Sequence, residues 1–196
     1  MTNKEAAMMQ DLILKNRSYR RFYEDVPIDC PTLRELVDLA RLSASAGNKQ
    51  PLRYILSCTR ERNAVIFPNL AWAAYLKDWD GPVEGERPSA YIVMLADKEL
   101  SANFNWDAGI CSQSILLGAV ERGLGGCIIA SVNKPALRQA LSIPDTYEIV
   151  FVLAIGKPKE NVVIDPVGPD GDIKYWRDVD ATHHVPKRSL DEVIIG

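Results

Sequence analysis

The chain has 196 residues and a formal net charge of −3, and 47% of its residues are hydrophobic. This length and apolar content predict one domain, residues 1–196, with a sizeable core. The mild acidity excludes a general attraction to nucleic acid or to an anionic membrane. No run approaches the ~20 apolar residues of a membrane span, and the polar N-terminus is unlike a signal peptide. We therefore expect a cytoplasmic protein with neither nucleic acid nor membrane as a partner.

The first predicted helix carries a capping-box spacing over residues 2–5 and runs to about Lys15. A second helix is predicted from Pro31, with apolar residues at helical intervals behind it. Residues 53–59 predict a strand, and residues 90–97 predict a central strand because almost every side chain there is apolar.

Between these strands, residues 69–79 predict a short helix rich in aromatic side chains, and residues 80–89 predict a loop. The stretch 68–88 is thus a candidate lid over a substrate. Its aromatic residues are Trp72, Tyr75 and Trp79. Core packing explains these rings at least as well as contact with a substrate.

Residues 106–122 predict a helix that is apolar almost all round, which indicates burial in a core or a subunit interface. Two further strands are predicted over 126–131 and 148–156, with a helix capped by Asn133 between them. From residue 158 the chain is rich in turns until a capping-box spacing at 189–192. This C-terminal arm should lie along the body or along a second subunit.

The four cysteines are widely spaced and form no C-x-x-C pair. Reduced thiols, mostly in apolar surroundings, are therefore predicted in preference to disulfides or metal ligands. These cysteines are Cys30, Cys58, Cys111 and Cys127. His183 and His184 lack a third ligand at a useful spacing, so no metal site is predicted.

The glycines of GLGGC at 123–127 do not form a dinucleotide-binding motif, because Ile128 stands where the last glycine is required. They also follow a predicted helix and precede a strand, the reverse of the order that cradles a phosphate. A turn at the end of a helix is the better interpretation. The chain also lacks the Walker phosphate loop, the G-x-S-x-G elbow and the H-E-x-x-H zinc motif.

Two basic clusters near opposite ends of the chain suggest one bound phosphate. KNRSYRRF at 15–22 offers forked arginine donors and a serine hydroxyl, although alone it reads as a solvated turn. HVPKRSL at 184–190 places a second pair of cations before a capped helix. The small residues of SASAGNKQP at 43–51 leave space for a flat ligand, whose edge the polar side chains there can bind.

These segments give the chain its resemblance to the nitroreductase-like family of FMN-dependent oxidoreductases. The first family motif corresponds to NRSYRRF at 16–22 and the second to ASAGNKQP at 44–51. The third begins at Asp107 and runs through GLGGCIIAS, and the closing basic pair is at 187–188. The resemblance spans nearly the whole chain in the right order.

The resemblance implies a set of FMN-binding residues. One chain would supply the segment around the phosphate, ribityl chain and pyrimidine edge, and the partner subunit would supply the loop at 44–48. The implied residues are Arg17, Ser18, Arg20, Ala44, Ser45, Asn48, Ala130, Ser131, Lys187 and Arg188. Asn16 and Ala44 replace a cation and a proline of the family pattern, so the C-terminal pair should matter more for the phosphate.

The resemblance also implies an α+β fold: a sandwich with a central, mostly antiparallel sheet flanked by helices. The C-terminal arm, about 158–196, would extend onto the partner of a homodimer that holds FMN at its interface. NADH or NADPH would reduce the non-covalently bound FMN, which would then reduce a nitroaromatic or quinone in a ping-pong mechanism. No protein acid or base is required, and Arg20 would stabilise negative charge on the reduced ring.

Two alternatives stay open. A specialised member of the same family, such as a reductive dehalogenase or an enone reductase, would differ mainly in the lid at 68–88. A non-catalytic module would use the basic clusters to bind a phosphorylated ligand, and it would be colourless when purified.

Overall fold

The computed structural model describes residues 3–196 and, within the first helix, side chains from Met8 onward. The helices are α1 (Asn3–Lys15), α2 (Cys30–Arg41), α3 (Arg60–Ile66), α4 (Asn105–Glu121), α5 (Lys134–Leu141) and α6 (Leu190–Val193). Short 3-10 turns are η1 (Ala46–Asn48) and η2 (Phe67–Asn69). The strands are β1 (Phe22–Tyr23), β2 (Leu52–Ser57), β3 (Ala90–Asp97), β4 (Gly125–Ile129), β5 (Tyr147–Pro158), β6 (Val162–Pro166), β7 (Trp176–Arg177) and β8 (His183–Lys187).

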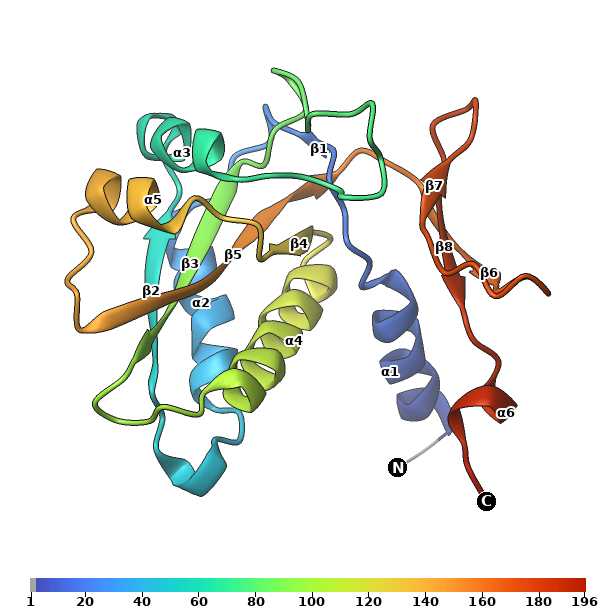
Figure 1. Ribbon diagram of the computed structural model, residues 1–196, viewed down its shortest axis with the longest axis horizontal. Coiled ribbons are helices and arrows are strands. Elements are labelled where there is room, and N and C mark those ends of the chain that lie inside the picture. The colour runs from blue at the N-terminus through green and yellow to red at the C-terminus, as the bar shows by residue number, and fades with distance from the viewer. Residues whose placement is uncertain (1–2) are drawn as a thin grey trace.

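A five-stranded antiparallel sheet forms the centre of the molecule (Figure 1). The long strand β5 pairs with β3 on one side and with β4 on the other, and its last residues pair with β1. Strand β2 lies outside β3. The sheet therefore brings β1 and β4, from distant parts of the sequence, against the same strand, β5.

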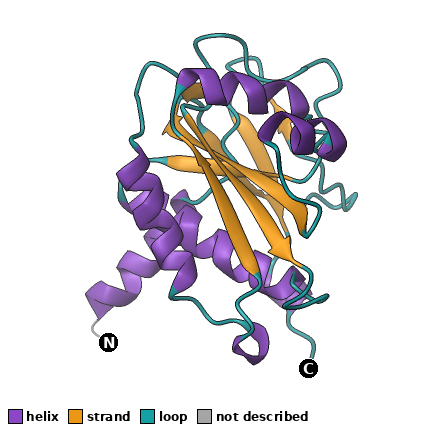
Figure 2. Ribbon diagram, turned by 90° about the vertical axis from the view of Figure 1, so that its left-hand side faces the viewer, coloured by secondary structure: helices purple, strands orange, loops and turns teal. Residues whose placement is uncertain are grey.

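Helices cover both faces of this sheet (Figure 2). One core packs α2 and α4 against alternate residues of β3, among them Ile92 and Met94. The other core packs α3 and α5 against the intervening residues, among them Tyr91 and Val93. Because successive side chains of a strand point to opposite faces, a strand buried on both faces must be apolar throughout. This confirms the prediction of a central strand at 90–97 and of the α+β sandwich.

The predicted GLGGC turn is confirmed at the end of α4. Gly123 has a φ of +70°, and its N–H donates to the Val120 carbonyl (3.0 Å). The Leu124 N–H donates to the Ala119 carbonyl (2.9 Å). Together these bonds form a Schellman motif, in which glycine tolerates the left-handed backbone that ends the helix.

Several predicted elements are confirmed with small shifts of their ends. Helix α2 contains the predicted Pro31, and Asp29 caps it by accepting from the Thr32 N–H (2.9 Å). Asn133 caps α5 as expected, and the predicted capping box at Ser189 is present in α6. The capping-box prediction over residues 2–5 depends on Thr2, which lies outside the described residues.

The helix predicted over 69–79 is wrong. The helix here is α3, seven residues long, which begins after Thr59 and passes into the turn around Pro68. The chain then bridges to Val132 through Leu70, and Ala73 has a φ of +41°, so a helix cannot continue. The next residues form turns, while the loop predicted over 80–89 is confirmed.

The prediction of four reduced cysteines is also wrong for one pair. Cys30 and Cys58 form a disulfide whose Cα atoms are 5.6 Å apart. Cys30 begins α2 and Cys58 follows β2, and packing of the helix against the strand brings them together. Cys111 and Cys127 are free and buried, as predicted.

The C-terminal arm has more structure than its turn-rich sequence predicts. Strands β6 and β8 pair in parallel, and β7 pairs antiparallel with β8, forming a second sheet. His184 fastens this sheet, because its ring nitrogens lie 2.7 Å from Asp165 Oδ2 and 3.3 Å from Asp178 Oδ2. Among residues 3–196, no helix has the length and apolar character needed to cross a membrane.

Candidate functional site

The segment that follows α1 is fixed against the start of β4. Ser18 forms a parallel bridge with Gly126, and the Tyr19 N–H donates to the Gly126 carbonyl (3.0 Å). A Cβ added to Gly125 would lie 2.5 Å from the Tyr19 ring, and one added to Gly126 would lie 2.6 Å from the Ala154 carbonyl oxygen. Glycine at 125 therefore lets the basic segment approach β4, and glycine at 126 lets β4 pack closely against β5.

Arg17 and Arg20 are the cations of this segment without a carboxylate partner among the described residues. Arg17 Nη2 donates to the Ile13 carbonyl (2.8 Å), while its buried Nε has no hydrogen-bond partner. Arg20 Nη1 donates to the Ser18 carbonyl (3.2 Å) and to His183 Nε2 (3.2 Å). Both guanidinium groups thus keep N–H donors available for an anion.

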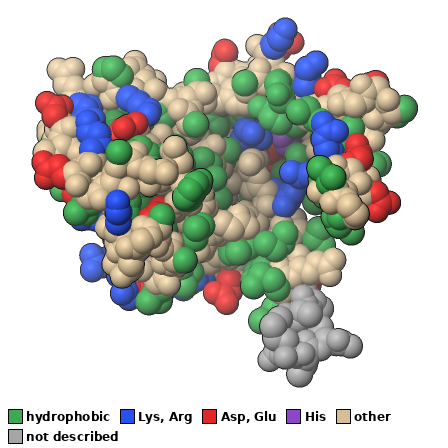
Figure 3. All heavy atoms as spheres, turned by 60° about the horizontal axis from the view of Figure 1, so that its bottom comes forward, with side chains coloured by type: hydrophobic (Ala, Val, Ile, Leu, Met, Phe, Trp, Pro, Cys, Tyr) green, Lys and Arg blue, Asp and Glu red, His purple; other side chains and the backbone are tan. Residues whose placement is uncertain are grey.

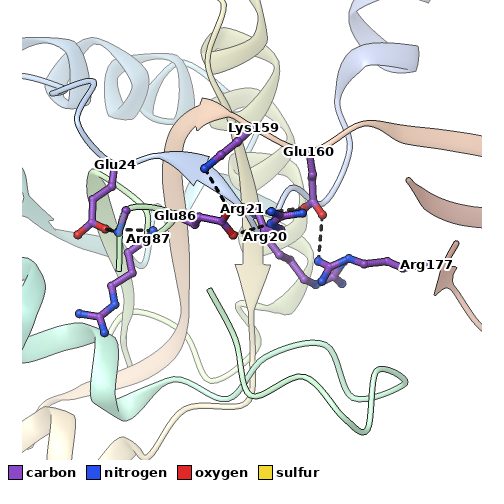
Figure 4. Close-up of polar contacts among 9 residues, drawn as sticks. Arg20, Arg21, Glu24, Glu86, Arg87, Lys159, Glu160 and Arg177 are labelled. Carbon is purple, nitrogen blue, oxygen red and sulfur yellow. Dashed lines mark hydrogen bonds and ion pairs between the residues drawn. The ribbon is translucent and has the colours of Figure 1, made fainter. Parts of the chain in front are cut away.

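Arg21 has a different role (Figure 4). Its Nε and Nη2 each lie 2.6 Å from a carboxylate oxygen of Glu86, and Lys159 Nζ lies 3.1 Å from the same carboxylate. These cations hold the pKa of Glu86 at about 2, chiefly through the Arg21 hydrogen bonds. Arg21 therefore fastens the loop before β3 to β1, and Glu86 occupies the Nε–Nη2 edge of its guanidinium.

Glu160 connects the basic segment to the C-terminal sheet (Figure 4). Its buried carboxylate accepts from the backbone N–H groups of Arg20 and Arg21 and from Arg177 Nη2 at 3.0 Å. The Arg177 guanidinium also lies over the Trp79 ring, 4.2 Å from its centroid. The carboxylate therefore sets the position of Arg20 relative to the arm.

Aromatic rings surround the Arg20 guanidinium. It lies 4.7 Å from the centroid of Tyr175, whose ring is 5.2 Å from His183 and 4.9 Å from Tyr75. Burial, and then the charges of Arg20 and Arg177, lower the pKa of His183 to about 4. His183 is consequently neutral near pH 7, and because Arg20 donates to Nε2, the proton must sit on Nδ1. That Nδ1 is buried and has no partner among the described residues.

The loop at 44–50 is held at the opposite end of α4. Asp107, in the first turn of α4, accepts from Ser45 Oγ and from the Ala46 N–H (3.0 Å). Ser45 Oγ in turn accepts from the Gln50 N–H (2.9 Å). Asn48 has a φ of +54°, a left-handed conformation that Asn adopts more readily than most residues. Ala44 and Asn48 are exposed.

The remaining predicted site residues are exposed on other elements. Ala130 and Ser131 directly follow β4, and the Ser131 carbonyl accepts from the Ala71 N–H (2.9 Å). Lys187 ends β8, and Arg188 Nη1 approaches Glu192 Oε1 at 3.5 Å within the next turn.

Not all of these residues meet within one chain. Arg17, Ser18 and Arg20 lie together beside β4, whose end leads into residues 130–131. The residues of the arm that touch this group are Glu160, Tyr175 and His183. His183 is at the start of β8, whereas Lys187 stands at the other end of that strand. Within residues 3–196 no hydrogen bond or ion pair links the basic pair at 187–188 to Arg17, Ser18 or Arg20.

A hollow separates the main body from the C-terminal sheet in Figure 3, and basic and histidine side chains are visible at its floor. Hydrophobic side chains line its rim. Such a hollow, with cationic donors and aromatic rings, suits a flat ligand that carries an anionic group. Of the candidate lid residues, Trp72 is buried in the core, whereas Tyr75 is 47% exposed.

The sequence alone did not indicate four residues that organise this region: Glu160, His183, Tyr175 and Asp107. Glu160 and His183 lie in the arm, where no periodicity marked a strand. Asp107 is a charged residue in the first turn of a helix predicted to be buried. Because a buried carboxylate requires hydrogen-bond donors, its presence there could have indicated such partners.

The model of the Nitroreductase family matches residues 13–157, which include the basic segment, the loop at 44–51, α4 and β4. The chain belongs to the Nitroreductase family. This confirms the family resemblance and the expectation of an enzyme of the nitroreductase type. The match ends before the arm, so it does not include the basic pair at 187–188.

Curated relatives match most of the chain. An Archaeoglobus fulgidus protein, whose assigned name proposes an NADH dehydrogenase/NAD(P)H nitroreductase, is 29% identical over 157 residues, covering 76% of this chain and 84% of the relative. The 4-nitrobenzoate reductase of a Nocardioides strain is 26% identical, covering 74% of this chain and 79% of the relative.

Solved members of the family share the fold. An FMN-dependent nitroreductase of Clostridium difficile superposes with a TM-score of 0.61 and 25% identity, covering 76% of this chain and 87% of that structure. A Nitroreductase family protein of Streptococcus pneumoniae gives a TM-score of 0.67 at 18% identity, covering 96% of this chain and 99% of that structure. The second likeness includes most of the arm and concerns the fold alone.

Proposed function

We propose that this nitroreductase-family protein is an FMN-dependent oxidoreductase that oxidises NADH or NADPH and reduces a nitroaromatic or a quinone by a ping-pong mechanism. The proposal rests on a difference among the three arginines of the basic segment that follows α1. Arg21 is committed to Glu86, whereas Arg17 and Arg20 keep free donors beside β4. The relatives named for nitroreductase activity support the reaction class.

The residues present fit FMN. The buried Nε of Arg17 and Nδ1 of His183 are donors without acceptors among the described residues, and the side chain of Ser18, which bridges to β4, is exposed. Unpaired buried donors are costly, and an anionic or carbonyl-bearing ligand would satisfy them. On this proposal Arg17, Ser18 and Arg20 hold the cofactor, beside the backbone of Ala130 and Ser131.

The rest of the binding site requires a second copy of the chain. The loop at 44–48 is tied to the start of α4, whereas Ser18 is tied to the strand that follows its end. The helix has 17 residues, so its ends are about 25 Å apart. Ser45 and Asn48 of the same chain are therefore too distant to share a flavin ring with Arg20, and those of a partner must supply these contacts.

A homodimer also accounts for the apolar surface. Exposed large apolar side chains occur on α1, α4 and the C-terminus, and such side chains mark interfaces when they gather in patches. They include Met8, Met9, Ile13, Leu14, Trp106, Ile110, Leu190, Val193, Ile194 and Ile195. Lys187 and Arg188, in this arrangement, approach the FMN phosphate from the arm.

When bound, FMN supplies the redox chemistry, accepting a hydride from NAD(P)H and delivering electrons to the acceptor. The protein's contribution is orientation and charge. Arg20, held by Glu160 and by the Tyr175 ring, places a fixed positive charge that offsets negative charge on the reduced ring. The rings of Tyr75 and Tyr175 limit the access of water.

The purified protein should be yellow, and the released chromophore should be FMN. Anaerobic NADH or NADPH should bleach it, and a nitroaromatic or a quinone should restore the colour. The Arg20→Ala protein reconstituted with FMN should be reduced more slowly. A colourless protein that takes up no added FMN would refute the proposal and favour a phosphate-binding module instead.

A further inference from the structure

A separate cavity of about 680 Å³ lies between α3, the loop before β3 and the segment after β1. This volume is within the range of small-molecule sites. Its lining shares no residue with the proposed flavin site. In Figure 4 the Arg87 side chain points away from Arg20 and Arg177, toward this cavity.

The polar floor of the cavity is built by alternate residues leading into β3. Arg87, Ser89 and Tyr91 all line it. Tyr91 is 1% exposed and Ser89 is 9% exposed. The Arg87 Nε, the Ser89 Oγ and the Tyr91 hydroxyl are buried, and none has a hydrogen-bond partner among the described residues.

Several neighbouring acceptors already receive hydrogen bonds from other groups. Glu24 Oε2 accepts from the backbone N–H groups of Gly85 and Arg87. Asn63 Oδ1 accepts from Ser57 Oγ (2.7 Å), and the Ser89 carbonyl accepts from Asn63 Nδ2 (2.7 Å). The three unpaired atoms can all donate, so the floor lacks an acceptor rather than a donor.

The walls of the cavity favour a ligand with an apolar body. Phe67 lies under the Arg87 guanidinium, 4.4 Å from its ring centroid, and apolar side chains complete the walls: Pro27, Ala64, Pro68 and Pro88. The Arg87 guanidinium forms no ion pair with a carboxylate of the described residues. Its charge is thus available to a carboxylate or phosphate group.

Acidic residues of the cavity favour a carboxylate over a phosphate. Glu24, Asp25 and Glu84 also line the cavity. Among the described residues one ion pair is formed with them, by Arg60, 3.2 Å from Glu84. Repulsion from these groups disfavours a multiply charged phosphate more than a singly charged carboxylate. We propose that this cavity is a second binding site, for a small monocarboxylate with an aromatic or other apolar body. Its carboxylate bonds to Arg87, Ser89 and Tyr91.

Benzoate is a suitable probe, titrated into the isotopically labelled protein as purified. The amide resonances of Ser89 and Tyr91 should shift saturably, and the visible spectrum reports separately on any binding near a flavin. Because each variant removes a hydrogen bond to a charged carboxylate, Arg87→Met or Tyr91→Phe should weaken binding at least tenfold. Arg62→Met, on the same α3 but outside the lining, should leave it unchanged.

Inorganic phosphate and benzyl alcohol should each bind at least tenfold more weakly than benzoate. Tyr91→Phe keeps the ring and therefore the packing, and thermal unfolding checks that each variant is folded. The proposal is overturned if benzoate causes no saturable shift at these amides. It is equally overturned if folded Arg87→Met and Tyr91→Phe bind benzoate as the parent does, or if phosphate binds as tightly.

Discussion

Asp107, buried in the first turn of α4, accepts the hydrogen bond that the Ser45 hydroxyl donates from the loop after α2. The second carboxylate oxygen accepts from the Ala46 N–H at 3.0 Å. One buried side chain therefore fixes the loop that we expect to reach a partner's flavin. Its charge is tolerated in an apolar core because donors surround it.

Replacing Asp107 with Ala should destabilise the protein, because the Ser45 hydroxyl and the Ala46 N–H would lose their acceptor. The expected loss in the free energy of unfolding is about 1–3 kcal/mol, measured by denaturant titration. Asp107→Asn keeps an acceptor for one of the two donors and should cost less. Equal stability of the Ala variant and the parent would show that the loop is held by other contacts.

Arg20 and Arg21 offer a matched pair of substitutions in one segment. Arg20→Met should lower the affinity for FMN at least tenfold while changing stability little, because its guanidinium pairs with no carboxylate. Arg21→Met should lower the free energy of unfolding by about 2 kcal/mol, because Lys159 would be the one remaining cation bonded to Glu86. It should lower the affinity for FMN less than Arg20→Met does. Fluorescence titration with FMN and denaturant unfolding separate the two effects. The reverse pattern would contradict the assignment of roles.

His183 should make stability depend on pH. Its pKa in the folded protein is about 4, below the ordinary 6.5, so the unfolded chain binds more protons between these values. The free energy of unfolding should therefore be highest above pH 6.5 and should fall, by up to about 3 kcal/mol, as the pH drops toward 4.

The variant His183→Gln keeps an acceptor for Arg20 and does not titrate, so the difference between variant and parent isolates this residue from the carboxylates. His184 acts in the opposite direction. Asp165 and Asp178 raise its pKa, so its contribution is present at low pH and is lost as the pH rises through that pKa. A pH profile unchanged by His183→Gln would show that His183 is not buried in its neutral form.

The Cys30–Cys58 disulfide should be detectable by counting thiols. The unfolded, unreduced protein should present two reactive thiols, those of Cys111 and Cys127. Cys30→Ser/Cys58→Ser should lose about 3 kcal/mol of stability, as expected for a separation of 28 residues. Since structural disulfides are rare in the cytosol, alkylation of the protein in intact cells also tests the predicted cytoplasmic location. Four reactive thiols would restore the original prediction.

The elements that the sequence predicted well carry strong local signals. The all-apolar strand at 90–97, the Asn133 cap and the glycines after α4 each follow from short-range chemistry. The predictions are wrong where tertiary contacts determine the backbone conformation. The aromatic run at 69–79 reads as helical by composition, yet Leu70 bridges to Val132 and Ala73 takes a left-handed backbone.

The residues of the candidate site likewise include some that the sequence indicated and others that only the fold reveals. Arg17, Ser18 and Arg20 were visible as a motif, and the structure places them together beside β4. Only the folded arm reveals that Glu160 and His183 hold Arg20, because those residues lie more than a hundred positions further along the chain. The placement of Lys187 and Arg188 near a phosphate stays a prediction, since it depends on the partner chain.

The most direct test of a flavin site shared between two chains is complementation in mixed dimers. One variant, Arg17→Ala/Arg20→Ala, would lack the donors beside β4, and the other, Ala44→Trp/Asn48→Gly, would lack the loop contribution. Both altered loop residues are exposed, and Gly accepts the left-handed backbone of Asn48. Each variant alone should bind almost no FMN. Heterodimers isolated with two affinity tags should bind one FMN per dimer, measured by absorbance, because one of their two sites combines the unaltered halves of both chains. Heterodimers that form but remain colourless in excess FMN would contradict the shared site.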